Sequence, residues 1–438
     1  MENALSDFRK IFDHVDRNDP EESIRNISHD LERIKEDKGI QASYNDLLRL
    51  EVALGIRKPS VAVYDNALHF IGGAQKYGCT IAQSLQEICD VTLISHKKVT
   101  LIQLQDWYGL DLDKCRTKVI KIPFFEARKK EKSTFDAGEV DLKGENPFHV
   151  VSMESGEYDI FINNCMLEMV YPLSNISEFV CHFPERERSR FFHADKYSHI
   201  ICNSRYTGEW VSRIWDLKPH KILYPPVDMM DSRELRNKEK IILSVSRFEL
   251  SGKKQQLEMI RIFERMLQRH PEKTKGWKMV IAGGSVNGNP YLERVRKASQ
   301  LLPEGKIDLR VDISLDELRE LYRKASIFWH LAGLEQRDPE RAEHFGMTTV
   351  EAMQNRCAPV VYRGGGQKEI IEAGVSGLFF DTRDGLVNRT LELMDSVSLR
   401  EKIGRGAFER GKGFTKKSFL HKAQKHFEEI LKGYCSVR

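Results

Sequence analysis

Short runs of β-branched and aromatic residues alternate with segments of helical periodicity over most of this chain. Such alternation predicts parallel strands in sheets that helices cover on both faces. In the first half, the predicted strands lie in residues 60–66, 91–96, 117–125, 158–164, 178–184 and 199–204. In the second half, they lie in residues 241–248, 277–284, 307–313, 326–332, 358–363 and 377–382. The sequence therefore predicts an α/β protein with two Rossmann-like domains.

The boundary between the two halves lies in residues 224–240, where two adjacent prolines precede a polar, charged run. This composition is typical of a linker. A chain of 438 residues is also too long for one hydrophobic core. We expect domains at residues 56–228 and 238–412, with a ligand cleft at the carboxyl ends of the strands.

Both ends of the chain have helical patterns. Apolar residues recur at helical spacing from Ile24 to Ile34, and a second apolar cluster runs from Leu47 to Leu54. Residues 1–55 are therefore expected to form a helical extension. In residues 413–438, one apolar stripe predicts a final helix that packs back on the first domain. The stripe consists of Phe419, Leu420, Ala423, Phe427, Ile430 and Leu431.

Composition excludes several classes of protein. The 69 Lys and Arg residues nearly balance the 65 Asp and Glu residues, and a net charge of +4 argues against a nucleic-acid partner. The 8 cysteines form no C-x-x-C pair and no zinc-site spacing, which favours a reducing compartment. Neither a leader sequence nor a long apolar run is present, so we expect a cytoplasmic protein.

The segment 343–380 carries the most specific pattern, EHFGMTTVEAM followed by a strand and three glycines. Gly346 lets a ligand approach the backbone, and the amides of a helix that begins near Met347 favour an anion. Glu343 before this helix could accept from sugar hydroxyls, and Glu351 within it from ribose hydroxyls. The alternative is that Glu351 is an ordinary first-turn glutamate favoured by the helix dipole and that Glu343 is a capping residue.

This segment closely resembles family 4 of the retaining glycosyltransferases, in particular bacterial-type members with an EHFGxTTVEAM core. The resemblance extends more loosely over residues 60–430 and leaves out the first 55 residues. It implies the GT-B architecture, in which two Rossmann-like domains face a cleft. It also implies transfer of a hexose-type sugar, with retention, from a nucleoside diphosphate to a hydroxyl. In that family, Phe345, Gly346 and Met347 belong to the donor site.

The resemblance assigns further donor-site residues one at a time. Arg247 and Lys254 match the family's arginine and lysine that hold the donor diphosphate, with Lys253 as an alternative one residue away. An arginine fork and an ammonium group would stabilise the charge that grows as the glycosidic bond breaks. Gly72 and Gly73 match a glycine pair that approaches the phosphate.

Other matches concern the base, the sugar and the glycine run. The base-contacting backbone falls near Ile313. The glycine run 364–366 is either a donor-side loop or a tight turn. His182 and His330 end predicted strands, and either could be functional or structural. Where many relatives have a sugar-contacting histidine, this chain has Asn164, so Asn164 and His182 are both candidates for that role.

No metal cofactor is expected, because the Arg247 and Lys254 charges can neutralise the diphosphate. We interpret Asp111 and Asp113, which form a D-x-D pattern, as surface charge. The catalytic set is therefore expected to be Glu343, Arg247, Lys254 and His182. Two alternatives keep the fold: a nucleotide-sugar epimerase or a glycoside phosphorylase. A third is a non-catalytic, nucleotide-sugar-binding partner of another transferase.

The expected partners are a nucleotide-sugar donor and a glycan or lipid-linked acceptor. Basic segments at 128–132 and 416–426 could contact an anionic membrane surface, or they are simply charge that faces solvent. Residues 1–55 could bind a protein partner. The sequence does not specify the sugar, the base or the acceptor.

Overall fold

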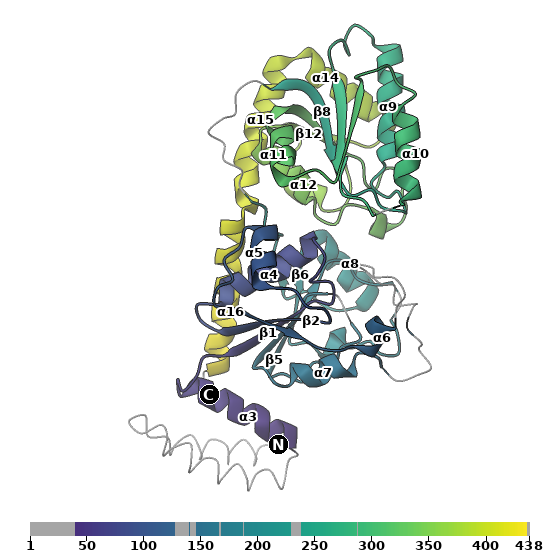
Figure 1. Ribbon diagram of the computed structural model, residues 1–438. Helices are drawn as coiled ribbons and strands as arrows, with labels where there is room; N and C mark the ends of the chain where they lie inside the picture. Colours follow the sequence, from purple (N-terminus) through teal and green to yellow (C-terminus); the bar gives the residue numbers. More distant parts are fainter. Residues whose placement is uncertain are drawn as a thin grey trace. The chain divides into compact units, whose positions relative to one another are not determined.

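The computed structural model describes residues 40–127, 140, 146–165, 168–186, 188–228, 238–286 and 288–435. The predicted helical pattern at 24–34 and the basic segment 128–132 lie outside these residues. The chain divides into two units (Figure 1). Unit 1 comprises the residues up to Cys202, Val211–Leu223 and the residues from Leu420 onward. Unit 2 comprises Asn203–Trp210 and Tyr224–Phe419.

Unit 1 contains a 7-stranded parallel sheet in the order β3-β2-β1-β4-β5-β6-β7. Its strands are β1 (Ser60–Tyr64), β2 (Asp90–Ser95), β3 (Arg116–Val119), β4 (Ile160–Asn163), β5 (Ile176–Cys181), β6 (His199–Cys202) and β7 (Lys221–Ile222). The first six correspond to the six predicted runs. Strand β7 was not predicted, because two residues are too few to form a recognisable pattern.

The helices of unit 1 include α3 (Ile40–Ala53), α4 (Gly73–Leu85), α5 (Leu101–Tyr108), α6 (Pro123–Glu126), α7 (His149–Ser155) and the second part of α8 (Arg205–Trp215). The predicted strand at 117–125 is in fact two elements. Strand β3 ends at Val119, and Pro123 begins α6. Proline suits the first turn of a helix because it has no amide hydrogen and its φ is fixed near the helical value.

Unit 2 contains a 6-stranded parallel sheet in the order β10-β9-β8-β11-β12-β13. Its strands are β8 (Glu239–Val245), β9 (Lys278–Gly283), β10 (Ile307–Val311), β11 (Ala325–His330), β12 (Ala358–Tyr362) and β13 (Leu378–Phe380). Its helices are α9 (Gln256–Arg269), α10 (Pro290–Ser299), α11 (Leu315–Lys324), α12 (Met347–Gln354), α13 (Gln367–Ile370), α14 (Arg383–Asp395) and α15 (Val397–Gly411). The predicted α/β class with two parallel, Rossmann-like sheets is confirmed.

Each strand order contains one point at which the direction of winding reverses. In unit 1 this switch point lies between β1 and β4, and in unit 2 it lies between β8 and β11. Crossover loops leave the two strands of a switch point in opposite directions, which opens a crevice at their carboxyl ends. The residues that follow β1, β4, β8 and β11 are therefore the first places to look for a ligand site.

The final helix α16 (Lys416–Cys435) contributes its residues from Leu420 onward to unit 1. Ala423 and Phe427 of the predicted stripe are fully buried. Glu178 of β5, also fully buried, lies between His199 Nδ1 at 2.8 Å and His426 Nε2 at 3.4 Å. Burial raises the pKa of Glu178, but the two histidines outweigh it and lower the pKa overall.

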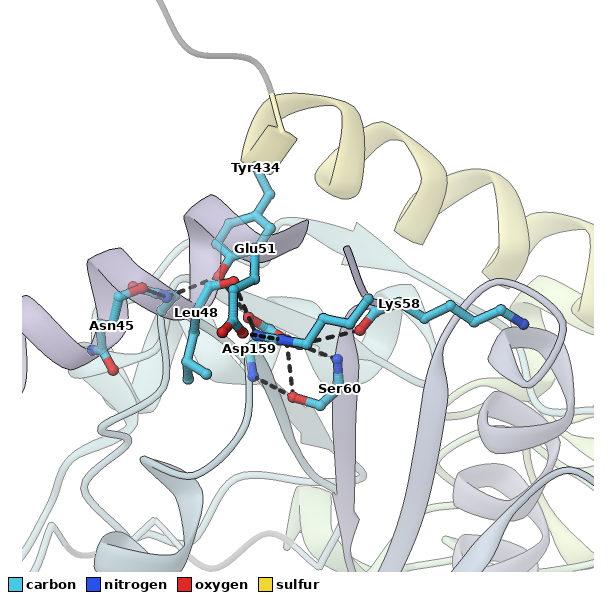
Figure 2. A network of polar contacts seen from close by, with 9 residues as sticks. Asn45, Leu48, Glu51, Lys58, Ser60, Asp159 and Tyr434 are labelled. Carbon is cyan, nitrogen blue, oxygen red and sulfur yellow. Dashed lines mark hydrogen bonds and ion pairs between the residues drawn. The ribbon is translucent and has the colours of Figure 1, made fainter. Parts of the chain in front are cut away.

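A second buried carboxylate, Asp159, ties the two ends of unit 1 to its sheet (Figure 2). Its two oxygens accept hydrogen bonds from Arg57 at 2.6 and 3.0 Å, from the amide and hydroxyl of Ser60 at 2.7 and 2.9 Å, and from Tyr434 Oη at 2.8 Å. Arg57 also donates to Glu51 of α3 at 2.7 Å. Helix α3, strand β1 and helix α16 therefore all depend on one side chain.

None of the helices in the described residues combines the length and the apolar character that crossing a bilayer requires.

Removing the Asp159 carboxylate should be costly. In Asp159→Ala, Arg57 loses its counter-ion, and the donors of Ser60 and Tyr434 lose their acceptor. We expect the free energy of unfolding of unit 1 to fall by about 3–5 kcal/mol. The measurement is urea denaturation followed by circular dichroism. The control is Glu87→Ala, which removes an ion pair with Lys114 whose side chains are 63% and 59% exposed. It should cost under about 1 kcal/mol, and equal costs for the two variants would contradict the account.

Candidate functional site

The predicted residues of unit 2 follow the two strands of its switch point. Arg247 lies two residues after β8, and His330 is the last residue of β11. Helix α9 begins at Gln256, and Lys254 lies two residues before it. Gln256 is fully buried and donates to the carbonyl of Arg247 at 3.0 Å, which fixes the backbone at that position.

Glu343 lies at the centre of this edge and binds two cationic or ionisable partners. Lys254 Nζ and His330 Nε2 lie 2.7 and 2.9 Å from the same carboxylate oxygen, Oε2. The side chains of Glu343, Lys254 and His330 are 15%, 19% and 5% exposed. Burial raises the pKa of Glu343, but Lys254 and His330 outweigh burial and hold the pKa well below its usual range. Glu343 is therefore ionised at neutral pH.

This arrangement leaves polar groups that a ligand can use. Both ion pairs involve Oε2 of Glu343, and Oε1 has no hydrogen bond or ion pair within the described residues. That oxygen can accept from a hydroxyl group. The Lys254 ammonium has three donors and spends one on Glu343. Nδ1 of His330 is buried without a partner among the described residues. The cluster could therefore bind a hydroxyl and an anion side by side.

Three glycines set the backbone around Glu343. Gly346, which precedes α12, has φ +116°, a value that L side chains rarely adopt. A Cβ on Gly365 would lie 2.0 Å from the carbonyl oxygen of Glu343, and one on Gly366 would lie 2.3 Å from that of His344. The Gly366 amide also donates to the Glu343 carbonyl at 2.8 Å. The glycine run thus packs directly behind Glu343, a role that its spacing in the sequence could not reveal.

Glu351, on α12, accepts from the hydroxyl of Tyr322 at 2.6 Å through its Oε2. Tyr322 belongs to α11 and is fully buried. This contact orients the half-buried Glu351 carboxylate. Sequence reasoning missed Tyr322, because a tyrosine in an amphipathic helix looks like any other core residue.

The two neighbouring lysines have different surroundings. Lys254 contacts Glu343, whereas Lys253 Nζ lies 3.9 Å from Glu249 Oε2. Arg247 also faces Glu249, with 3.3 Å between Nη2 and Oε1, and its side chain is 63% exposed. Within the described contacts, Lys254 is therefore the basic residue that joins the Glu343 cluster, and Arg247 lies at the surface beside it.

Three of the predicted donor-site residues pack into the protein. Phe345 is 3% exposed, and its ring stacks on Tyr224 with centroids 5.5 Å apart. Met347 is partly buried against the apolar cluster that contains Phe345. Ile313, which follows β10, is partly buried against a second apolar cluster of unit 2. The proposed role of Ile313 involves its backbone, so the position of its side chain does not affect it.

Unit 1 has a polar cluster at its own switch point. Asn164, directly after β4, is fully buried, and its Nδ2 donates to Asp65 Oδ2 at 2.7 Å and to the Ala74 carbonyl at 2.9 Å. Asp65, directly after β1, also accepts from Gln75 Nε2 at 3.3 Å. Burial raises the pKa of Asp65, and these hydrogen bonds lower it only in part. Asp65 could have been noticed, since it directly follows the first predicted strand.

The remaining predicted residues of unit 1 lie at the same edge of the sheet. Gly72 precedes α4, and Gly73 is its first residue. His182 directly follows β5 and lies edge-on to the Tyr77 ring, with centroids 5.4 Å apart. Burial lowers the pKa of His182 to about 4, so its imidazole is neutral at physiological pH.

The predicted D-x-D pair, Asp111 and Asp113, makes local hydrogen bonds. Asp113 accepts from Gln105 at 2.7 Å, and Asp111 Oδ1 accepts from the Asp113 amide at 3.1 Å. Within the described ranges, no group of three or more His, Cys, Asp or Glu side chains is placed to hold a metal ion.

Comparison with known proteins identifies the second unit. Residues 228–410 match the model of the family described as glycosyl transferases group 1. Over this range, which falls in unit 2, the chain is similar to the group 1 glycosyl transferases. An uncharacterized glycosyltransferase of Methanocaldococcus jannaschii is 30% identical over 119 residues, which are 27% of this chain. The match spans only 32% of that relative.

Solved structures resemble the chain over more than four fifths of its length. Anabaena HepE in complex with UDP and glucose has a TM-score of 0.60 and 16% identity, over 86% of this chain and 100% of that one. The pneumococcal O-GlcNAc transferase GtfA in complex with UDP and GlcNAc has a TM-score of 0.58 and 13% identity, over 86% and 99%. At these identities the matches show the fold, which is the predicted GT-B fold.

The close packing of the glycine run behind Glu343 can be tested by adding a single methyl group. Gly366→Ala places Cβ against the backbone of His344 and Phe345, which no side-chain rotation relieves. We expect unfolding to become easier by about 1–3 kcal/mol, measured by urea denaturation. The control is Gly413→Ala, where a Cβ would meet nothing within 4 Å. If Gly366→Ala is as stable as Gly413→Ala, the packing described here is wrong.

Proposed function

We propose that the protein is a retaining glycosyltransferase that moves a hexose-type sugar from a nucleoside diphosphate to a hydroxyl acceptor. The observation that carries the proposal is the Glu343 cluster. It combines an ionised carboxylate with one uncommitted oxygen, a lysine at 2.7 Å and a histidine at 2.9 Å, beside the start of α12. The match of residues 228–410 to the group 1 family supports the same reaction class. The UDP and sugars in the HepE and GtfA structures agree with such a donor.

In the proposed reaction, the bond between the anomeric carbon and the donor phosphate breaks, and the acceptor oxygen bonds to that carbon on the same face. The acceptor proton passes to the departing diphosphate. Arg247 and Lys254 stabilise the charge that grows on the diphosphate, and the first amides of α12 add to their effect. Glu343 Oε1 accepts from a hydroxyl of the sugar and holds it in place. Catalysis then rests on positioning and on charge stabilisation.

Within this proposal Glu351 binds the ribose, oriented by Tyr322, and Ile313 contacts the base through its backbone. Gly72 and Gly73 approach the phosphate, and Asn164 or His182 contacts the sugar. The acceptor, a glycan or a lipid-linked saccharide, is bound by the loops of unit 1.

The first test is a thermal-shift screen against UDP, GDP, ADP and their sugars. A ligand at 100 times its dissociation constant stabilises the folded protein by about 2.7 kcal/mol. Sugar transfer is then assayed with the nucleotide sugar that binds. Consumption of that donor with and without acceptor distinguishes a transferase from an epimerase. Failure of every nucleotide to bind would refute the proposal.

The two glutamates should have separable roles. Glu343→Gln should slow transfer about a hundredfold or more, because a preorganised contact at the reacting centre is lost. Binding of the bare nucleoside diphosphate should barely change. Glu351→Gln should weaken the bare diphosphate and the full donor alike, by about 1.5–3 kcal/mol. Both variants are titrated by calorimetry and assayed for transfer after circular dichroism has shown that they are folded.

The control for this pair is Glu293→Gln, on α10, whose side chain is 65% exposed and paired with Arg296. It should behave as the unmodified protein. If Glu343→Gln abolishes diphosphate binding while Glu351→Gln leaves it intact, the two roles are assigned the wrong way round. If both variants transfer sugar at full rate, the proposed site is wrong.

Transfer should also proceed in EDTA. Arg247, Lys254 and the helix amides supply the positive charge that a divalent cation supplies in other transferases. The assay compares initial rates in EDTA, in Mg²⁺ and in Mn²⁺ after exhaustive dialysis. Complete loss of activity on chelation, restored by either cation, would show that the charge account is incomplete.

A further inference from the structure

The loop between β1 and α4, residues 65–72, has a buried base and an exposed tip. Asp65 and Leu68 are each 1% exposed, whereas Ile71 is 65% exposed. At the base, Asp65 Oδ1 accepts from the Ala67 amide at 2.8 Å, and the Asp65 amide donates to the Ile94 carbonyl at 2.9 Å. The tip ends in Gly72, which has no side chain that could fix it.

One hydroxyl group bridges two backbone groups of the tip. The Gly72 amide donates to Tyr108 Oη at 3.1 Å, and Tyr108 Oη donates to the Phe70 carbonyl at 3.2 Å. Tyr108 is the last residue of α5 and is 5% exposed. Thr100 caps the other end of α5 through a reciprocal hydrogen-bond pair with Gln103. The position of the hydroxyl is therefore set by a packed helix and not by the loop.

The orientation of Gly72 determines where the first amides of α4 point. The first bond of the helix runs from the Lys76 amide to the Gly72 carbonyl at 3.0 Å, so the amides of Gly73, Ala74 and Gln75 precede the helical bonding pattern. Gly72 itself is in an extended conformation, with φ −164°. Any residue adopts this conformation, so backbone strain does not hold Gly72 in place.

We propose that Tyr108 is a positioning residue for sugar transfer: its hydroxyl fixes Gly72, so that the amides at the start of α4 face the donor phosphate. This inference rests on the proposed function, which assigns Gly72 and Gly73 to the donor phosphate. Tyr108 acts through Gly72 and does not touch the donor. Without the hydroxyl, the Gly72 amide and the Phe70 carbonyl lose their partner, and the glycine pair samples other orientations.

The test variant is Tyr108→Phe, which removes one oxygen atom and keeps the packed ring. The matched control is Tyr158→Phe in the same unit. Tyr158 lies just before β4, and its hydroxyl donates to Glu154 at 3.2 Å. Hydrogen exchange of the peptide that covers residues 66–76 reports on the loop itself. Steady-state kinetics report the KM values for the nucleotide sugar and for the acceptor separately.

In Tyr108→Phe we expect loop exchange and the KM for the nucleotide sugar both to rise about five- to tenfold, the effect of one lost hydrogen bond. The acceptor KM should stay constant, and Tyr158→Phe should change none of the three. A purely structural role would lower the amount of active enzyme and the apparent kcat without changing either KM. That result, or unchanged loop exchange, would overturn the inference. If the unmodified enzyme transfers no sugar, the proposed function itself has failed.

Discussion

Parallel pairing of the strands is the constraint on which both units depend. Because every described strand pair is parallel, the carboxyl ends of each sheet gather at one edge and the amino ends at the other. The strand order reverses direction once in each sheet. The loops that follow the two strands on either side of this reversal leave the sheet in opposite directions. Asp65 and Asn164 lie at the reversal of unit 1, and Arg247 and His330 lie at that of unit 2. The amino edge of unit 1 instead holds Asp159, whose contacts serve the fold.

Asp159 and Glu343 differ in how many of their carboxylate oxygens the protein itself uses. Both oxygens of Asp159 are used by donors from Arg57, Ser60 and Tyr434. The two partners of Glu343 both contact Oε2, and Oε1 has no partner among the described residues. A carboxylate whose two oxygens both accept hydrogen bonds from the protein stabilises the elements around it and has no oxygen available for a ligand. A carboxylate that is held through a single oxygen is oriented and can still bind a ligand through the other, which is what the proposed role of Glu343 requires.

The sequence predicted the fold well, whereas it named only some of the residues that the structure places around the predicted site residues. All twelve predicted runs contain a strand. Short runs of β-branched residues between helical segments strongly favour buried parallel strands. The run at 117–125 was too long, since nothing in its pattern marked the helical turn at Pro123. The residues Glu343, Lys254 and His330 are far apart in the sequence, and the family resemblance alone suggested that they act together. Tyr108 and Tyr322 were missed because each supports neighbouring groups through one hydroxyl, and such a contact leaves no spacing to recognise. Asp65 was missed although its position directly after the first predicted strand is a signal.

The discontinuity of unit 1 has a consequence for the order in which the chain matures. Strand β7 ends at Ile222, yet Tyr434 supplies one of the donors that Asp159 requires. A ribosome that adds 5–20 residues per second takes roughly ten to forty seconds to bridge that interval. All six strands of the second sheet are synthesised within it. The second sheet can therefore form while Asp159, already paired with Arg57 and Ser60, still lacks the hydrogen bond from Tyr434. A nascent chain that is released early would carry both sheets but would lack the end of α16 that packs on the first one.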